Sequence, residues 1–345
     1  MNLLYTLLEK DIFPDEWIRW KIRSLLKMRL RHENKGSLEE NQKHLIEYIR
    51  FLKNSPIATH TIDANEQHYE VPAEFFQLVM GKYMKYSSGY WPDPKIGLDE
   101  SERLMLQLYC DRARLEDGMT VLDLGCGWGS LTLFIAEHYP KCKITAVSNS
   151  KSQKQFIDSE VKKRKLKNVQ SITADVNTFR SNLKFDRILS VEMLEHMRNY
   201  EALFEKLSGM LKPKGLFFAH VFTHHKYAYS FEVEDETDWM AQHFFFGGQM
   251  PSHQLLLYFQ KDLLLENQWI INGMNYARTS EAWLSNFHAN KSKILEIFAR
   301  TYGEDQKKKW FVYWKVFFMA CAELWKFNQG EEWIISHYLF RKSKP

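Results

Sequence analysis

Cysteine is scarce in this chain, and its four copies are scattered. They lie at positions 110, 126, 142 and 321 of 345 residues, and no two form a C-x-x-C pair. A zinc site or a disulfide framework needs such pairs, so neither is indicated, and we expect no bound metal. A reducing compartment such as the cytoplasm fits this cysteine usage.

The chain also lacks a long apolar run, a secretory signal and a strong net charge, and each absence excludes a class of protein. No run of about 18 apolar residues occurs, so we expect no segment that spans a membrane. The apolar first residues soon meet Glu9, Lys10 and Asp11, without the basic region and small-residue cleavage site of a secretory signal. The net charge of +4 is too mild to indicate a nucleic-acid partner.

Apolar residues, in contrast, are plentiful. Hydrophobic residues make up 45% of the chain and aromatic residues 15%, which suffices for one large domain or for a core domain with additions. Four stretches are expected: a helical N-terminal extension at 1–60, lead-in helices with a covering loop at 61–118, an α/β core at 119–222, and an insertion with helices and closing strands at 223–345.

The core stretch alternates strand and helix. Strands are predicted at 120–124, 143–147, 170–173, 185–191 and 216–221, and helices at 129–138, 151–165 and 199–211. This alternation indicates a doubly wound, mostly parallel α/β sheet. A helical region at 280–328 and a final strand at 332–340 follow, and we expect that strand to pair antiparallel.

A glycine turn follows the first core strand. Gly125, Gly127 and Gly129 are spaced G-x-G-x-G, unlike the G-x-G-x-x-G of a dinucleotide site, and no carboxylate ends the next strand. A phosphate-cradling G-x-x-x-x-G-K-[ST] is also missing. With Asp123 before it, the D-x-G-x-G run resembles motif I of class I methyltransferases that use S-adenosyl-L-methionine (SAM), where the turn lies against the cofactor.

The ends of the next strands offer further contacts for such a cofactor, because ligands of doubly wound sheets lie at the carboxyl ends of the strands. Ser148, Asn149 and Gln153 follow the second strand and suit ribose hydroxyls. Asp175 follows the third and suits an adenine amino group, and Val176 is placed to pack on the ring.

Three titratable residues follow the fourth strand: Glu192, Glu195 and His196. Burial at a strand end perturbs pKa values, which is typical of functional sites, so we predict that these three are catalytic. A plainer alternative is that Glu195 caps the next helix and His196 only supports its neighbours. His220 follows at the end of the fifth strand.

Taken together, these motifs resemble the cyclopropane-fatty-acyl-phospholipid synthase superfamily, and within it most closely the branch of coclaurine N-methyltransferase and related benzylisoquinoline alkaloid N-methyltransferases. The resemblance spans roughly residues 60–343. The matching segments are Glu66–Pro72, Tyr86–Tyr90, Asp123–Gly129, Glu192–Met197, Gly248–Ser252, Leu256–Gln260 and Gly330–Trp333.

The resemblance implies a Rossmann-like class I methyltransferase fold with a mostly parallel seven-stranded sheet, and SAM as cofactor. It places Tyr86 and Ser87 at cofactor-contacting positions. It assigns Glu195 and His196 to the substrate amine, with Glu192 and Tyr69 on the substrate side. A homodimer is what relatives suggest.

Two departures favour N-methylation over cyclopropanation. The synthases hold a bicarbonate base partly through a cysteine of a Tyr-Ser-Cys motif, and Ser88 stands there in this chain. They also usually have His-Thr-Ile where this chain has His220-Val-Phe222. A serine still donates a hydrogen bond, so a lipid-modifying, synthase-like enzyme stays an alternative, as does a non-catalytic SAM-binding protein.

For N-methylation, we hypothesise that His196 acts as the base or positions it, and that Glu195 anchors the amine. An aromatic wall suits a cationic amine, at about 0.5–2 kcal/mol for each cation–π contact. About half of the candidates are expected to be core instead. They are Tyr90, Trp91, Trp239, Phe244, Phe245 and Phe246, with His220 as a further substrate-side residue.

Two features outside the core allow more than one interpretation. Residues 17–31 form a basic amphipathic helix, which we interpret as a lid; under the lipid alternative it would contact an anionic membrane surface. Cys321 lies near a cysteine often marked in the synthases, but its apolar helical context favours core packing.

Overall fold

The computed structural model describes residues 3–59, 71–231, 239–240, 244–245 and 247–343. Its centre is a seven-stranded sheet in the order β3-β2-β1-β4-β5-β9-β8. The pairs from β3 to β5 are parallel, and β9 runs antiparallel to both β5 and β8. The predicted α/β class and the antiparallel closing strand are therefore confirmed.

The strands and helices have the following bounds. The strands of the sheet are β1 (Thr120–Leu124), β2 (Lys143–Ser148), β3 (Val169–Thr173), β4 (Phe185–Val191), β5 (Leu211–His224), β8 (Leu263–Ile271) and β9 (Trp333–Lys342), and a small ribbon holds β6 (Tyr229–Ser230) and β7 (Gln249–Met250). The helices are α1 (Leu3–Glu9), α2 (Asp15–Glu33), α3 (Leu38–Asn54), α5 (Ala73–Val79), α6 (Leu98–Arg112), α7 (Ser130–His138), α8 (Lys151–Lys163), α9 (Tyr200–Met210), α11 (Met274–Ala289), α12 (Lys291–Tyr302) and α13 (Lys307–Lys326).

Local sequence signals explain where several helices begin. The Ser150 hydroxyl accepts from the backbone N–H of Gln153 at 3.3 Å and caps α8. The Asn199 side chain accepts from Ala202 at 3.0 Å and caps α9. Such caps satisfy backbone donors that the first turn of a helix leaves unpaired.

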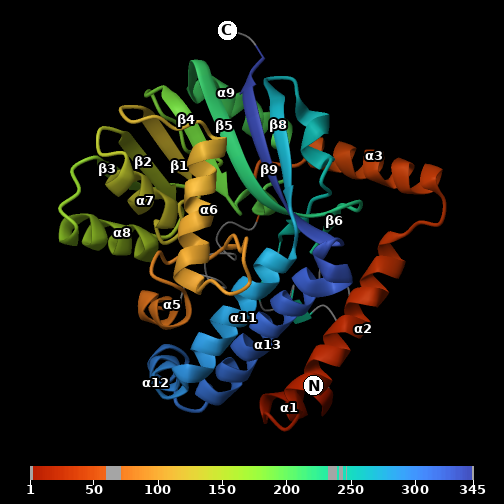
Figure 1. The fold of residues 1–345 in the computed structure, drawn as a ribbon. Helices are drawn as coiled ribbons and strands as arrows, with labels where there is room; N and C mark the ends of the chain where they lie inside the picture. The colour runs from red at the N-terminus through yellow and green to blue at the C-terminus, as the bar shows by residue number, and fades with distance from the viewer. Residues whose placement is uncertain (1–2, 60–70, 232–238, 241–243, 246, 344–345) are drawn as a thin grey trace.

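The two faces of the sheet carry separate cores. Helices α6 and α7 cover one face and α9 covers the other, as Figure 1 shows. Side chains alternate between faces along a strand, so on β5 Phe218 packs toward α6 whereas Phe217 and Ala219 pack toward α9. His220 shares its face with Phe218 and lies under α6.

Strand β8 was not predicted from the sequence. It is one of the two edge strands of the sheet, and its middle residues are polar, with Glu266 and Gln268 partly buried and Asn267 exposed. A register shift between Leu265 and Asn267 further breaks the alternation that marks a half-buried strand.

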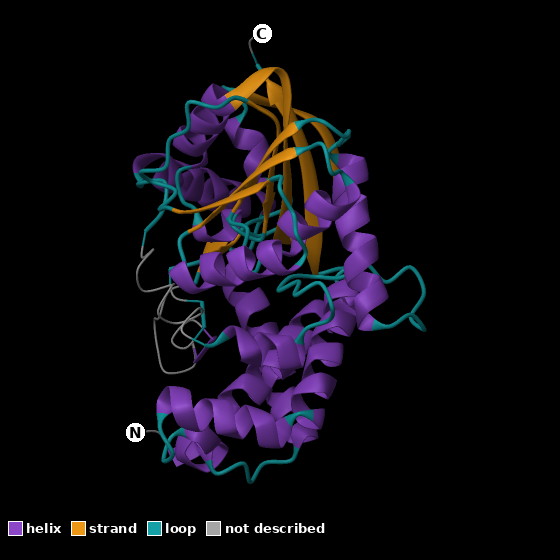
Figure 2. Cartoon of the chain, turned by 90° about the vertical axis from the view of Figure 1, so that its left-hand side faces the viewer, coloured by secondary structure: helices purple, strands orange, loops and turns teal. Residues whose placement is uncertain are grey.

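Helices α11, α12 and α13 and the N-terminal α2 gather at one end of the sheet (Figures 1 and 2). Glu323 on α13 is buried, and its carboxylate accepts from Arg19 and Arg23 of α2, each at 2.9 Å. Arg19 also pairs with Glu281 of α11 at 2.6 Å. None of the helices formed by the described residues is long and apolar enough to cross a bilayer.

Candidate active site

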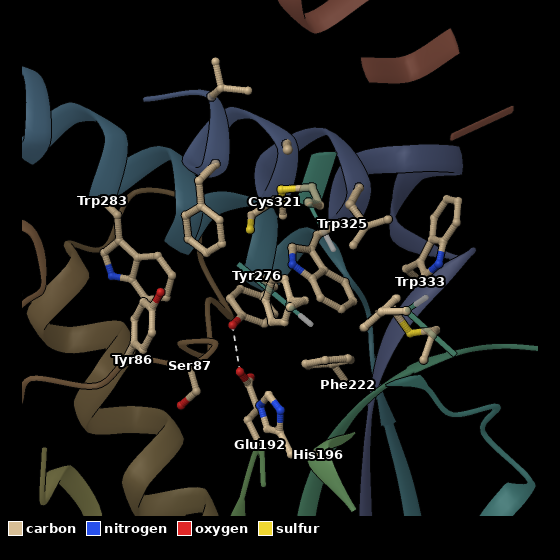
Figure 3. A pocket seen from close by; sticks show the side chains of 18 of the residues that line it. Tyr86, Ser87, Glu192, His196, Phe222, Tyr276, Trp283, Cys321, Trp325 and Trp333 are labelled. Carbon is tan, nitrogen blue, oxygen red and sulfur yellow. Dashed lines mark hydrogen bonds between the residues drawn. The ribbon is translucent and has the colours of Figure 1, made fainter. Parts of the chain in front are cut away.

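A cavity of about 780 Å³ lies between the carboxyl ends of the sheet strands and the helices α2, α11 and α13. A smaller cavity of about 100 Å³ adjoins it along the ends of β2 and β3. The two share Gly125, Gly127, Gln153, Glu192 and His196, so they lie side by side. Figure 3 shows the aromatic side of the larger cavity.

The glycine turn forms the floor where the two cavities meet. A Cβ on Gly125 would come within 2.6 Å of Met193, so only glycine fits there. Gly127 has a φ of +52°, a value that favours glycine, and no atom lies within 4 Å of where its Cβ would be. Gly127 therefore leaves open space that a ligand can approach closely.

Polar groups around this turn suit a nucleoside. The Ser148 hydroxyl donates to Gln153 Oε1 at 2.6 Å, which leaves Gln153 Nε2 buried with no hydrogen-bond partner. Asn149, Asp175 and Val176 line the smaller cavity. A buried amide donor without a partner costs free energy, and a bound hydroxyl would remove that cost.

Asp123 and the Tyr86–Ser87 segment line the larger cavity. Asp123 is buried, accepts from the Thr132 hydroxyl at 2.6 Å, and has its pKa raised by burial to about 6. The buried Lys85 ammonium donates to the Ser87 hydroxyl and, at 2.7 Å, to the Ser88 carbonyl, which holds this segment in place. These residues and the open Gly127 fit SAM, and they would hold its amino-acid and ribose parts.

Glu192 is the carboxylate at the end of β4 that lines the cavity. Its Oε2 accepts from the Tyr276 hydroxyl at 2.7 Å (Figure 3). Its Oε1 lies 3.1 Å from His220 Nε2 and accepts from the Ser88 N–H at 3.3 Å. Burial raises the pKa of Glu192 to about 7, with Lys85 the main group that favours the ionised form. A base with a pKa near 7 suits proton transfer at neutral pH.

His196 lines both cavities beside Glu192. Burial lowers its pKa to about 4, so its imidazole is neutral at physiological pH. A neutral imidazole can accept or donate one hydrogen bond at each nitrogen position, according to tautomer.

Glu195 does not line the cavity as the sequence suggested. Its side chain is buried behind the wall, and Oε1 accepts from the Phe222 N–H at 2.6 Å. Burial and the nearby Glu192 raise the pKa of Glu195 well above its usual value. The structure thus gives the cavity-facing position to Glu192 and ties Glu195 to the backbone of β5.

An aromatic wall faces Glu192 across the larger cavity. Tyr276 of α11 and Trp325 of α13 stack with ring centroids 4.7 Å apart and planes 7° apart. Phe222 packs beside Trp325 (Figure 3), and the predicted Trp239 and Phe245 also line the cavity. Tyr276 and Trp325 were not identified from the sequence, because aromatic residues on apolar helices look the same whether they face a core or a cavity.

Several of the other predicted substrate contacts lie elsewhere. Tyr90 does not line the cavity, because its loop is held against α6 and α11: its N–H donates to Ser101 and the Trp91 N–H donates to Asn275. Phe244 is core and stacks on Phe317. His220 lies behind Glu192 and touches it rather than the cavity. Tyr69 and Phe246 are outside the described residues.

Helices α2 and α13 each contribute several cavity residues that the sequence did not single out. Ile18, Ile22 and Leu26 of α2 line the cavity. Cys321, expected in the core, is buried and also borders the cavity, and burial raises the pKa of its thiol. The helical amphipathicity of residues 17–31 was the signal for α2, but it does not say what its apolar face covers.

A cluster outside the cavity has the spacing of a metal site: His224, His225 and Glu332. His224 Nδ1, however, accepts from the N–H groups of Lys226 and Tyr227 at 2.9 and 2.8 Å. The proton of His224 therefore lies on Nε2, which is 3.1 Å from Glu332. A protonated nitrogen is no ligand, so this cluster is a histidine–carboxylate pair.

The seven-stranded sheet, with a glycine turn after β1 and polar residues at the next strand ends, is the fold of class I SAM-dependent methyltransferases. Residues 58–333 match the mycolic acid cyclopropane synthetase family, and the chain belongs to that family. The fold is shared with the cyclopropane synthase MmaA2 of Mycobacterium tuberculosis, at 21% identity and a TM-score of 0.69, over 83% of this chain and 99% of that one.

Similarity is much higher to one group of relatives. An (S)-coclaurine N-methyltransferase of Thalictrum flavum subsp. glaucum is 40% identical over 97% of this chain and 94% of its own length. A crystal structure of coclaurine N-methyltransferase bound to N-methylheliamine and SAH has a TM-score of 0.95 and 38% identity, covering 98% of this chain and 99% of that one. The cyclopropane-fatty-acyl-phospholipid synthase of Escherichia coli (strain K12) is 27% identical over 78% of this chain and 65% of its own length.

Proposed function

We propose that this chain transfers the methyl group of SAM to the nitrogen of a small aromatic or cyclic amine of the benzylisoquinoline kind. The observation that carries the proposal is Glu192, a largely buried carboxylate that lines the cavity together with the glycine turn and the aromatic wall. The high similarity to coclaurine N-methyltransferases over nearly the whole chain supports it.

The site favours a positively charged nitrogen. The rings of Tyr276, Trp325 and Phe222 border the space beside Glu192. Aromatic faces attract an ammonium by cation–π contact, and the carboxylate attracts it by charge. These aromatic rings and the carboxylate of Glu192 can stabilise the charge that develops on the nitrogen during transfer.

Proton removal is the step that the side chains must perform. An amine that arrives as an ammonium has no free electron pair, and the ionised Glu192 can accept its proton. His196, neutral at physiological pH, holds the nitrogen by a hydrogen bond or passes the proton on. SAM supplies an electrophilic methyl group when bound. Glu195 acts through the backbone of Phe222, which it anchors.

The lipid-modifying alternative is less favoured. A synthase-like bicarbonate would lie near Ser88, but the Ser88 hydroxyl donates to the Gly89 carbonyl at 2.9 Å, and its N–H is used by Glu192. Little donor capacity is therefore left at Ser88 for an anion.

Methyl transfer from labelled SAM tests the proposal. Purified protein is given a panel of benzylisoquinoline and simple aryl-alkyl amines and, in parallel, vesicles of unsaturated phospholipid with and without bicarbonate. We expect label in an amine. Label in the lipid instead, enhanced by bicarbonate, would mean that the chain is a synthase. Tight SAM binding without transfer to either would leave a binding protein.

We further propose a cytoplasmic location and a homodimer. The location is supported by the four cysteines, all of which are free thiols. Cell fractionation and light scattering test these two points, and neither result bears on the chemistry.

A further inference from the structure

A row of hydrogen-bonding side chains runs behind Glu192, on the face of the sheet covered by α6. His220 of β5 and His337 of β9 are directly opposite each other across the antiparallel pair, and Trp269 of β8 is the next residue in the same row. Residues opposite each other on neighbouring strands share a face, so these rings meet. His220 and His337 are both fully buried.

The row ends at an arginine. His337 Nδ1 lies 2.7 Å from the Arg112 guanidinium, which comes from the last turn of α6 and stacks over Trp269 at 4.9 Å. His337 Nε2 lies 2.9 Å from His220 Nδ1. His220 Nε2 lies 3.1 Å from Glu192 Oε1. The row therefore links a half-buried cation to the carboxylate that faces the cavity.

The geometry fixes where each proton lies. A guanidinium only donates, so His337 Nδ1 accepts and the proton of His337 is on Nε2. That N–H points at His220 Nδ1, which must then accept, so the proton of His220 is on Nε2 as well. Burial lowers the pKa of both histidines well below the usual value, which keeps each ring neutral with a single proton.

We propose that Arg112 and His337 are positioning residues of the active site: they lock His220 in the tautomer that donates to Glu192 and so keep Glu192 ionised. Neither residue touches the cavity. The inference deepens the proposed function and rests on it. Tyr109, whose hydroxyl is 2.9 Å from His220 Nδ1, cannot fix the tautomer by itself because a hydroxyl both donates and accepts.

Every hydrogen bond in the row is donated in the direction from Arg112 toward Glu192, and this limits where a proton on Glu192 can go. Each proton is held in place by the permanent charge of Arg112, which does not give up a proton in a protein. The row therefore cannot carry the substrate's proton away from Glu192. That proton leaves on the cavity side, where His196 lies.

The first test is the pH profile of kcat for Arg112→Met. Without the guanidinium, His337 is free to turn its proton toward Nδ1, and His220 no longer has to donate to Glu192. We expect the pKa of Glu192 to rise by about one unit, which lowers kcat about fivefold at pH 7 and hardly at all at pH 9. A loss of equal size at every pH, or no loss, would overturn the proposal.

Matched variants separate this effect from a structural one. Arg112→Lys restores a permanent donor and should restore kcat at pH 7. Arg103→Met removes another arginine of α6, which pairs at the surface with Glu100, and should leave the profile unchanged. His337→Phe keeps the ring in its packed place but removes its N–H, and should repeat the pH-dependent loss.

The other titratable groups near Glu192 and the histidines stay in place in all these variants, and His337→Phe also keeps the charge of Arg112 that acts on Tyr109. They are Lys85, Tyr109, Glu195, His196, Tyr276 and Cys321.

A second readout does not depend on turnover. Histidine ¹⁵N NMR of the whole protein reports the tautomer of each ring, with His220 and His337 assigned from His220→Asn and His337→Phe spectra. We expect both rings as Nε2–H tautomers in the wild type and a mixture in Arg112→Met. An Nδ1–H tautomer of His220 in the wild type would overturn the inference even if the protein methylates amines. Failure of the wild type to methylate any amine would instead overturn the proposed function.

Discussion

Glu192 has an unusual backbone as well as an unusual pKa. Its φ is 47°, in the left-handed region, which costs a residue with a Cβ about 1–2 kcal/mol. Such a conformation persists only where its surroundings enforce it, and it is frequent at functional sites. Here the Glu192 N–H donates to the His220 carbonyl at 2.9 Å, which fixes the turn and aims the carboxylate at the cavity.

Replacement of this carboxylate is the most direct test of its role. Glu192→Gln keeps the size of the side chain but removes the base, so we expect kcat to fall by about 10²–10⁴-fold, the usual contribution of acid–base catalysis. SAM affinity, measured by calorimetry, should stay close to that of the wild type. Glu201→Gln, on the part-exposed side of α9, is the control and should be fully active. A Glu192→Gln variant with normal kcat would show that another group accepts the proton.

The raised pKa of Glu192 also predicts how kcat depends on pH. Burial places its pKa at about 7, so below that pH the group is protonated and cannot accept a proton from the amine. We expect kcat to rise with pH through about 7 and then to level off, since kcat reports groups in the enzyme–substrate complex. His196, with a pKa of about 4, adds no limb above pH 5. Persistence of the limb in Glu192→Gln would assign it to a different group.

Among single residues, the sequence singled out the end of β4, whose Glu192 and His196 line the cavity, but did not indicate which of its two carboxylates faces it. Glu192 and Glu195 are three residues apart, and the left-handed backbone at Glu192 turns the two side chains in different directions. The positions of Glu192 and Glu195 in the sequence do not indicate that their side chains point in different directions. His337 lies far along the chain, and only the pairing of β5 with β9 brings it to His220.

Among the elements, the glycine turn allows the effect of a substitution on SAM binding to be measured separately from its effect on stability. In Gly127→Ala the new methyl meets no protein atom but projects into the cavity, so we expect weaker SAM binding by calorimetry. Gly118→Ala, also at positive φ in open space but away from the cavity, is the matched control. Both variants should lose about 1–2 kcal/mol of stability from the backbone alone. Equal SAM affinity in the two would mean that the turn does not contact the cofactor.

Ion pairs join α2 to α13, and both helices line the cavity. Glu323→Gln removes the buried charge that Arg19 and Arg23 share, while Arg19 keeps Glu281. We expect a loss of about 1.5–3 kcal/mol in urea unfolding, the contribution typical of hydrogen bonds to charged groups, and a raised KM for the amine. Glu304→Gln, from an exposed pair with Lys307, should change neither. A raised KM without loss of stability would mean that Glu323 acts on the substrate directly.

The central elements could be predicted because their patterns are local. The bounds of β1 and β4 agree with the prediction, since each contains adjacent buried apolar residues, Val121 and Leu122 in β1 and Ile188 and Leu189 in β4. Strand β8 and the aromatic wall could not be predicted in this way, because they are defined by contacts with segments that are distant in the sequence. No period in the sequence distinguishes Tyr276 or Trp325 from a core residue, because the cavity and the core use the same side chains.

For the molecule as a whole, the structure allows a test of whether α2 binds a membrane surface. The apolar residues of α2 that would enter a bilayer, among them Ile18 and Ile22, line the cavity instead, although Trp20 is 58% exposed. Binding to a membrane surface scales with the apolar area that enters it. We therefore expect little co-sedimentation with anionic phospholipid vesicles. Strong co-sedimentation that is lost in Arg31→Glu would favour the lipid alternative.

The order of the strands in the sheet also bears on how the protein is made. Strand β9 lies between β5 and β8, yet β8 precedes it in the sequence. While the ribosome makes residues 272–332, which takes roughly 3–12 s at ~5–20 residues per second, β8 has no neighbour to pair with. Its exposed backbone edge is then open to wrong pairing between nascent chains. Because His337 lies on the same late strand, the pairing of β9 completes both the sheet and the row of side chains behind Glu192.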